Sequence, residues 1–595
     1  VHVPHSVADA HTKQSTPQTV HWPPSRKAPA WHALHVAVPA LLPVWLHVPQ
    51  PATPLYPLAP AASEHRMHSV PGAAPGPSFC ITHLSLDRRT LAISFFCFSF
   101  EPVSQPVCLD PSSRINLSHY SLPHHKRPSF HRSKSIKMPL SEDTIKAVEA
   151  TADLVAAQGL DFTRAFYERM LTRNEELKDV FNLSHQRDLR QPKALLDSLV
   201  AYARSIRKIN ELHELQEQGL PVPAERLAEL QGFFAVAERI AHKHASVGIQ
   251  PAQYQIVGAH LLATIEERVT ADKAILAAWS KAYDFLAHLF VRREEEIYTE
   301  TESSEGGWRQ TRSFRVEEKA QITERIFRFR LVPAEKGTAV ALHKPGQYLA
   351  VFVRDPRLSP HRQIRQYSIT SAPNHTYYEI AVHRDKQATV SGYLHDHVAV
   401  GDLLKLAPPY GDFFLEYREP GGQAADGQPS PEPLALHGGA VNFAAERMTP
   451  IVLISGGIGQ TPLLSMLRFL AEKEGQAAIR PIFWIHAAHD SRARAFKAEV
   501  DAIKVTDLPG LRTTTFLSEV DETMDKKGED YDFAGRISLD RVPGLAELEA
   551  DGANPHYFFV GPAGFMVAVE QQLKAWSVPE DRIHFEMFGP FKPLQ

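Results

Sequence analysis

Cysteine is scarce in this chain and is confined to its first quarter. The three cysteines of the 595 residues are Cys80, Cys97 and Cys108. The remaining three quarters therefore use no disulfide, no thiolate metal site and no cysteine nucleophile, which is typical of a reducing compartment. We expect a cytoplasmic protein.

The chain also lacks a strong charge bias and a long apolar run. Its formal net charge of −4 provides no large basic field for nucleic acid. The longest apolar runs, Val36–Leu46 and Leu91–Phe100, are interrupted by proline or serine and are shorter than the ~20 residues of a membrane span. We expect neither nucleic acid as a partner nor a membrane span.

Residues 1–137 have few acidic residues, many Pro, Ser and His, and no sustained helical or strand period. This composition predicts a disordered extension or an over-extended gene model. The scarcity of acidic residues makes a mitochondrial targeting segment the alternative. We expect the folded chain to start at Met138.

Residues 138–300 show the apolar period of helices. Ser141 offers an N-cap to a first helix. Further apolar stretches at helical spacing cover residues 195–209, 233–244, 254–269 and 274–297. The sequence predicts an all-α domain here.

From Trp308 the apolar period changes to two, and then strands and helices alternate. Strand-like runs occupy residues 314–316, 326–331, 348–353 and 378–382, and predict an antiparallel β-barrel over 305–418. Residues 419–447, rich in Gly, Pro and Ala, predict a linker or surface loop. Residues 448–595 alternate buried strands with helices and predict an α/β domain with a parallel sheet.

Two glycine-containing loops follow predicted strands of the α/β region. One contains Gly456, Gly457 and Gly459 followed by Gln460, Thr461 and Pro462, and the other begins with Gly561 and Pro562. Glycine lets the backbone approach a pyrophosphate, and the following helix supplies amide donors. Because Pro462 replaces the third glycine of the G-x-G-x-x-G pattern, a plain tight turn is the alternative.

The tetrad Arg365, Gln366, Tyr367 and Ser368 suits a flavin. Arg365 can neutralise a phosphate, Tyr367 can pack on the ring system and Ser368 can hydrogen-bond to it. An ordinary half-exposed strand is the alternative for the tetrad taken by itself.

Together with the glycine loops and the C-terminal Phe585–Pro590, the tetrad resembles the ferredoxin-reductase-like family. The resemblance implies a FAD barrel followed by a domain for NADH or NADPH, with Phe588 over the flavin face and Tyr348 near the flavin. Two positions depart from the family pattern. Ala388 lies in a turn where relatives have glycine, and Val560 stands where many have cysteine.

A second set of residues suits a haem. His244 follows an apolar helix, and Tyr254 and Glu294 lie on later helices that can pack beside it. A histidine that ligates haem iron commonly donates its other ring N–H to such an acceptor. On the opposite side, Tyr167 can hydrogen-bond a bound oxygen molecule, and the other residues proposed for this pocket are Phe181, Gln191 and Leu195. Core packing is the alternative for each of these residues.

The complete set resembles the flavohaemoglobins, from Met138 to the C-terminus. Segments 166–170, 251–258, 307–308 and 364–368 carry the likeness. The resemblance implies haem b on His244, with Tyr254 and Glu294 as its partners and with Tyr167, Gln191 and Leu195 lining the distal pocket. It also implies FAD and NADH or NADPH in the reductase part.

The activity implied by the resemblance is that of a nitric oxide dioxygenase, which oxidises nitric oxide to nitrate with dioxygen and electrons from NAD(P)H through FAD. We expect these small molecules as the only partners, and a monomer. An oxygen carrier or sensor whose flavin module keeps the iron ferrous, and a plain flavin reductase, are the alternatives. Arg492 and Arg494 leave the choice between NADH and NADPH open.

Residues 209–231 have no counterpart in a typical flavohaemoglobin. Since longer surface loops cost little entropy, a tolerated surface insertion is one interpretation and a gene-model error is the other. We expect a deletion of this segment to leave haem binding intact.

Overall fold

The computed structural model describes residues 139–182, 186, 188–385, 389–416, 449–477 and 480–589. The predicted N-terminal extension, the predicted linker and Ala388 lie outside these ranges.

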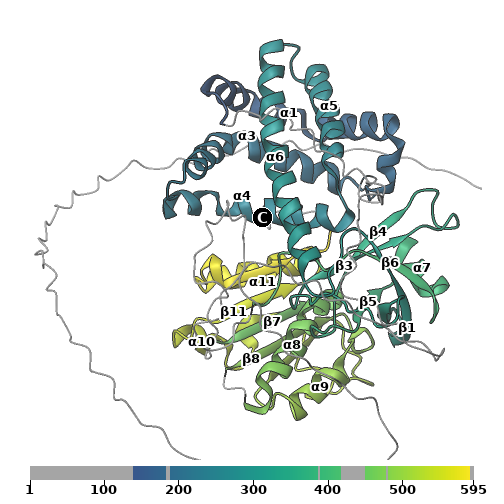
Figure 1. Ribbon diagram of the computed structural model, residues 1–595. Coiled ribbons are helices and arrows are strands. Elements are labelled where there is room, and N and C mark those ends of the chain that lie inside the picture. Colours follow the sequence, from purple (N-terminus) through teal and green to yellow (C-terminus); the bar gives the residue numbers. More distant parts are fainter. Residues whose placement is uncertain are drawn as a thin grey trace, which may run out of the picture. The chain divides into compact units, whose positions relative to one another are not determined.

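The N-terminal described part is all-α, as predicted. Its helices are α1 (Glu142–Arg173), the short η1 (Glu175–Asp179), α3 (Arg190–Glu217), α4 (Ala224–Val247), α5 (Pro251–Arg268) and α6 (Lys273–Ser303) (Figure 1). Ser141 caps α1 by accepting the Thr144 N–H at 3.4 Å. Gly159, at φ 58°, kinks α1, because this left-handed conformation cannot continue a right-handed helix. In the described part of the chain, no helix is both long and apolar enough to cross a membrane.

Residues 209–231 are not a surface insertion. They form the last turns of α3, an exposed turn and the first turns of α4. Ile209, Leu212 and Leu230 are at most 3% exposed and belong to the helical core. Asn210 Oδ1 accepts the Leu140 N–H at 2.8 Å. The expectation of a surface insertion is therefore wrong, because the two extended helices pack their apolar faces into the domain.

The middle part is the predicted antiparallel barrel. Its strands are β1 (Arg312–Thr323), β2 (Ile326–Pro333), β3 (Tyr348–Val353), β4 (Gln363–Ser368), β5 (Tyr378–His383) and β6 (Leu403–Leu406), with α7 (Thr389–His397) between β5 and β6. The strand order is β4-β3-β6-β1-β2-β5. An antiparallel bridge between Ile369 and Ile380 joins the two edges, so that no edge strand is left open there.

The C-terminal part is the predicted α/β domain with a parallel sheet. The strands are β7 (Ile451–Gly456), β8 (Ile482–Ala488), β9 (Arg512–Leu517), β10 (Phe533–Ala534), β11 (His556–Val560) and β12 (Ile583–Glu586). The helices are α8 (Gln460–Glu474), α9 (Lys497–Thr506), α10 (Leu545–Ala550) and α11 (Ala563–Ala575). Short 3-10 helices are η3 (Gly457–Gly459), η4 (Gly475–Ala477), η5 (Ser491–Ala493), η6 (Leu539–Arg541) and η7 (Glu580–Arg582).

The sheet order β10-β9-β8-β7-β11-β12 places the first strand of this domain in the interior. From β7 the chain builds outward through β8 and β9, and it returns to the other side of β7 with β11. The order therefore reverses between β7 and β11. Ligands of open α/β sheets bind beyond the carboxyl ends of the strands at such a switch point.

Candidate functional site

His244 lies in the last turns of α4 and forms a hydrogen-bonded triad with Tyr254 and Glu294. Its Nδ1 lies 2.8 Å from Glu294 Oε1 and 2.9 Å from the Tyr254 hydroxyl. The Tyr254 hydroxyl also donates to Glu294. Because a carboxylate only accepts, we assign the proton to Nδ1, which leaves Nε2 as the ligand atom. The structure thus brings together the three residues that the sequence grouped.

Helix packing holds Tyr254 in this triad. Gly258, one turn further along α5, lets the Tyr283 ring lie against the helix, since a Cβ at this glycine would be 2.5 Å from the ring. The Tyr283 hydroxyl then donates to the Tyr254 carbonyl at 2.7 Å. Burial, together with the Glu294 carboxylate, raises the pKa of Tyr254, so that its hydroxyl remains a donor.

Tyr167 forms a second polar group with Gln186 and Gln191. Burial raises the pKa of Tyr167, and the polar side chains of the two glutamines beside it oppose this rise. The Phe181 ring meets the Tyr167 ring edge-on with centroids 5.9 Å apart, and Leu195 is partly buried against the same core. Sequence reasoning missed Gln186, which lies just before α3 and has no motif around it.

These residues fit a haem. The His244 side chain is 35% exposed whereas Glu294 behind it is 4% exposed, so that the ring faces open space. The Gln191 amide oxygen and the Gln186 amide nitrogen are buried, and neither has a hydrogen-bond partner among the described residues. Buried polar atoms without partners are unusual in proteins and suit a ligand with polar atoms of its own. Phe290, whose ring centroid is 5.9 Å from that of His244, supplies an apolar wall.

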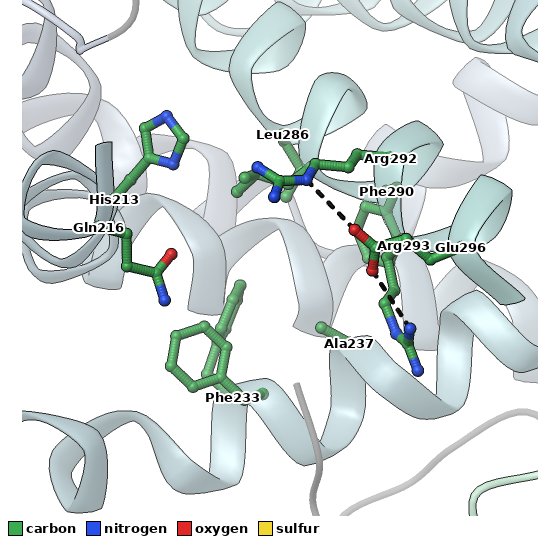
Figure 2. Close-up of a pocket in the computed structure, with 11 residues that line it drawn as sticks. His213, Gln216, Phe233, Ala237, Leu286, Phe290, Arg292, Arg293 and Glu296 are labelled. Carbon is green, nitrogen blue, oxygen red and sulfur yellow. Dashed lines mark hydrogen bonds and ion pairs between the residues drawn. The ribbon is translucent and has the colours of Figure 1, made fainter. Parts of the chain in front are cut away.

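A hollow between α3, α4 and α6 adjoins this site (Figure 2). Its volume is about 40 Å³. Phe290 lines it, together with His213 and Phe233 from the extended helices, but none of the predicted site residues does. Arg292 and Arg293 at its edge form ion pairs with Glu296.

The predicted flavin tetrad forms the larger part of β4, which pairs with β3 so that Ser368 lies opposite Tyr348. Burial lowers the pKa of Arg365, whose guanidinium donates to the Ile364 carbonyl at 2.7 Å. Burial raises the pKa of Tyr367. The Gln366 amide donates to Ser246 Oγ at 3.1 Å, two residues after His244. The tetrad strand is thus attached to the helix that carries the candidate iron ligand.

Sequence reasoning missed a buried charge cluster next to this strand. Arg239 and Lys243 lie one turn apart on α4, where Arg239 pairs with Asp412 at 3.2 Å and the Lys243 ammonium donates to the Gly589 carbonyl at 2.6 Å. Burial raises the pKa of Glu586 to about 7, and Lys243 opposes the shift. Glu586 Oε2 is buried without a hydrogen-bond partner among the described residues. Nearby, Phe588 is 45% exposed, as an aromatic side chain that covers a bound ring would be.

The two glycine loops lie side by side at the switch point of the parallel sheet. A Cβ at Gly459 would be 2.2 Å from the Val560 carbonyl oxygen, and one at Gly456 would be 3.0 Å from the Phe565 ring. Gly457, at φ 55°, has open space where a side chain would be.

The residues around these loops suit a pyrophosphate. Pro562 is the N-cap of α11, and Gly561 before it packs against the same Phe565 ring. At the start of α8, Pro462 and Thr461 are buried, and the Thr461 hydroxyl donates to Ile458. The buried Gln460 amide nitrogen has no partner among the described residues. Close backbone packing, two helix starts without a side-chain cap and an unpaired side-chain amide favour an anionic ligand.

Comparison with known proteins agrees with this division of the chain. The globin family model matches residues 164–290, and the oxidoreductase NAD-binding domain model matches residues 453–571. Flavohemoprotein-1 and Flavohemoprotein-2 of Giardia intestinalis (strain P15) are each 75% identical over 456 residues, which is 76% of this chain and 99% of each relative.

A solved structure shows the same fold. It is that of a flavohaemoglobin from Malassezia yamatoensis with bound FAD and haem, and it matches with a TM-score of 0.58 at 24% identity, over 76% of this chain and 100% of that one. The chain therefore belongs to the flavohaemoproteins, in which a helical globin domain is followed by a ferredoxin-reductase-like module that binds FAD and NAD.

Proposed function

We propose that this protein is a nitric oxide dioxygenase, which converts nitric oxide and dioxygen into nitrate with electrons from NAD(P)H. The triad of His244, Tyr254 and Glu294 is the observation that carries the proposal, because an imidazole that donates to a buried carboxylate is a stronger electron donor. A plain oxygen carrier has no need of such a ligand. When bound, haem supplies the iron that carries dioxygen, and FAD converts a two-electron donor into single-electron steps.

The remaining site residues bind, orient or hold protons. Tyr167 is protonated at neutral pH, and burial raises its pKa further, so that its hydroxyl can donate to a bound oxygen molecule. Arg365 suits the flavin phosphate, and Tyr348, Tyr367 and Ser368 suit the ring system. Glu586, with a pKa of about 7, can take up or release a proton near neutral pH beside the flavin.

Consumption of nitric oxide tests the proposal. In air, addition of nitric oxide to the reconstituted protein is expected to accelerate NADH oxidation and to yield nitrate. An oxygen carrier or sensor would bind dioxygen without this acceleration. A plain flavin reductase would oxidise NADH with an artificial acceptor and would show no haem absorption.

We also propose that NADH is the preferred coenzyme. The loop after β8 meets the adenosine ribose in folds of this class. The Arg494 guanidinium donates to the Asp530 carbonyl at 2.9 Å and lies among Asp501, Asp530 and Asp532, so that it is already engaged. Arg492 is 88% exposed and lies 4.0 Å from Asp490. An acidic rim of this kind favours a ribose hydroxyl and repels a 2′-phosphate.

We expect kcat/KM for NADH to exceed that for NADPH by at least about tenfold, which corresponds to ~1.4 kcal/mol. Reduction of ferricyanide with each coenzyme measures this ratio without the haem. Asp490→Ser should raise kcat/KM for NADPH, since a serine can keep the cap on Ala493 while it removes the negative charge. Equal kcat/KM values in the unaltered protein would contradict the prediction.

A further inference from the structure

Asp179, the last residue of η1, contacts the segment that leads into the flavin strand. Its carboxylate accepts the backbone N–H of Arg362 at 2.9 Å, and its carbonyl accepts Nε of the same arginine at 3.2 Å. The Arg354 guanidinium pairs with the carboxylate, and His361 Nδ1 lies 3.5 Å from it. Asp179 thus makes four interactions with the segment 354–362, which is distant in the sequence.

The two contacting residues, Asp179 and Arg362, each lie beside one of the two candidate cofactor sites. Asp179 comes two residues before Phe181, whose ring packs on Tyr167. Arg362 comes directly before β4, the strand that carries the flavin tetrad. The contact therefore joins residues 179–181 at the edge of the candidate haem pocket, which we call the Phe181 corner, to the start of the candidate flavin strand.

Main-chain atoms make this contact more than a surface ion pair. Exposed ion pairs contribute little, and the Arg354 side chain is 65% exposed. The two hydrogen bonds of Arg362 instead involve a backbone N–H on one side and a backbone carbonyl on the other, so that they restrain both chains. Burial lowers the pKa of Arg362, in agreement with a packed rather than a solvated guanidinium.

The flavin strand is then attached at two points. Its start is joined to the Phe181 corner through Asp179, and its middle is joined to the end of α4 through Gln366 and Ser246. Electron transfer between the two cofactors depends on how closely and how rigidly their sites are held.

We propose that Asp179 is a positioning residue that fixes the Phe181 corner of the haem pocket against the flavin strand and thereby sets the path between the two redox sites. The inference rests on the proposed function, because it assumes that haem and flavin occupy these sites.

The test compares Asp179→Ala with Asp179→Asn in the full chain loaded with haem and FAD. Asparagine keeps an oxygen that can accept the Arg362 N–H, whereas alanine does not. Stopped-flow absorption under carbon monoxide follows reduction of the flavin and of the haem by NADH separately. We expect alanine to slow haem reduction by about tenfold, as small misplacements of reacting groups do. Flavin reduction should be unchanged, and asparagine should restore most of the haem rate.

Glu176→Ala is the matched control, because Glu176 lies on the same short helix, is exposed, and accepts a hydrogen bond from Asn174 at 3.3 Å. It should behave like the unaltered protein. Haem reduction at the unaltered rate in Asp179→Ala, or an equal loss in the alanine and asparagine variants, would overturn the proposal.

A second measurement requires neither nitric oxide nor electron transfer. Hydrogen–deuterium exchange of the Arg362 amide in the full chain should accelerate by at least about fivefold in Asp179→Ala, since a backbone hydrogen bond is lost. Unchanged exchange would also overturn the proposal. If the unaltered protein fails to consume nitric oxide, the proposed function fails, yet the exchange and electron-transfer measurements still decide the role of Asp179.

Discussion

Replacement of His244 by alanine is expected to abolish the Soret band and to lower nitric-oxide-dependent NADH oxidation by more than about a hundredfold. Loss of an outer partner of a metal-bound histidine already costs about 10–100-fold, and this change removes the ligand itself. Reduction of ferricyanide by NADH should persist, because the flavin strand and the glycine loops are unaltered. Absorption spectra and the two rate assays, made on the same preparation, check the prediction.

Two further variants separate ligation from folding. Glu294→Gln keeps an acceptor for the Nδ1 proton but loses the negative charge, so that haem should remain while the rate falls by about 10–100-fold. His288→Ala, an exposed histidine on the same helix as Glu294, should keep both the Soret band and the rate. A normal Soret band in His244→Ala would show that another residue holds the iron.

Deletion of residues 209–231 is expected to unfold the globin domain. The segment contributes Ile209, Leu212 and Leu230, all at most 3% exposed, to the helical core. Removal of each large apolar side chain from a core costs about 2–5 kcal/mol, and the sum is comparable to the ~5–15 kcal/mol by which a domain is stable. The haem site lies on the same helices, so that haem binding should be lost as well.

Far-UV circular dichroism and the Soret band, measured on the deletion variant, check this expectation. The matched control replaces only the exposed turn 218–221 by glycine and serine, which should leave haem binding intact and lower the stability by less than about 1 kcal/mol. Leu212→Asp should reproduce the effect of the deletion by burying an unpaired charge. A folded, haem-binding deletion variant would show that the domain can close without this segment.

The error about residues 209–231 has a physical origin. A helix that protrudes from the surface and a helix that packs one face into a core can have the same apolar period. The period indicates a helix, but it does not show which residues pack against it. Only the packing of α3, α4 and α6 shows that these apolar residues have partners. The same reasoning explains why Gln186 was missed, since nothing in its local sequence points to Tyr167.

The sequence by itself determined what depends on short stretches of chain. The change from helical spacing to alternation, the glycines at the ends of β7 and β11, and the residue types suited to haem and flavin are all local properties. They were sufficient for the three domains, whereas the resemblance to the flavohaemoglobins was needed to make Tyr254 and Glu294 the expected partners of His244.

The tertiary structure alone decided which distant groups meet. The cluster of Lys243, Arg239, Asp412 and Glu586, and the contact between Asp179 and Arg362, join residues more than a hundred positions apart. No local sequence pattern predicts such contacts, because they form only when separate helices and strands pack through their apolar faces. This packing places distant polar side chains next to one another. Burial then shifts the pKa of Glu586 to about 7, a property that its neighbours in sequence do not encode.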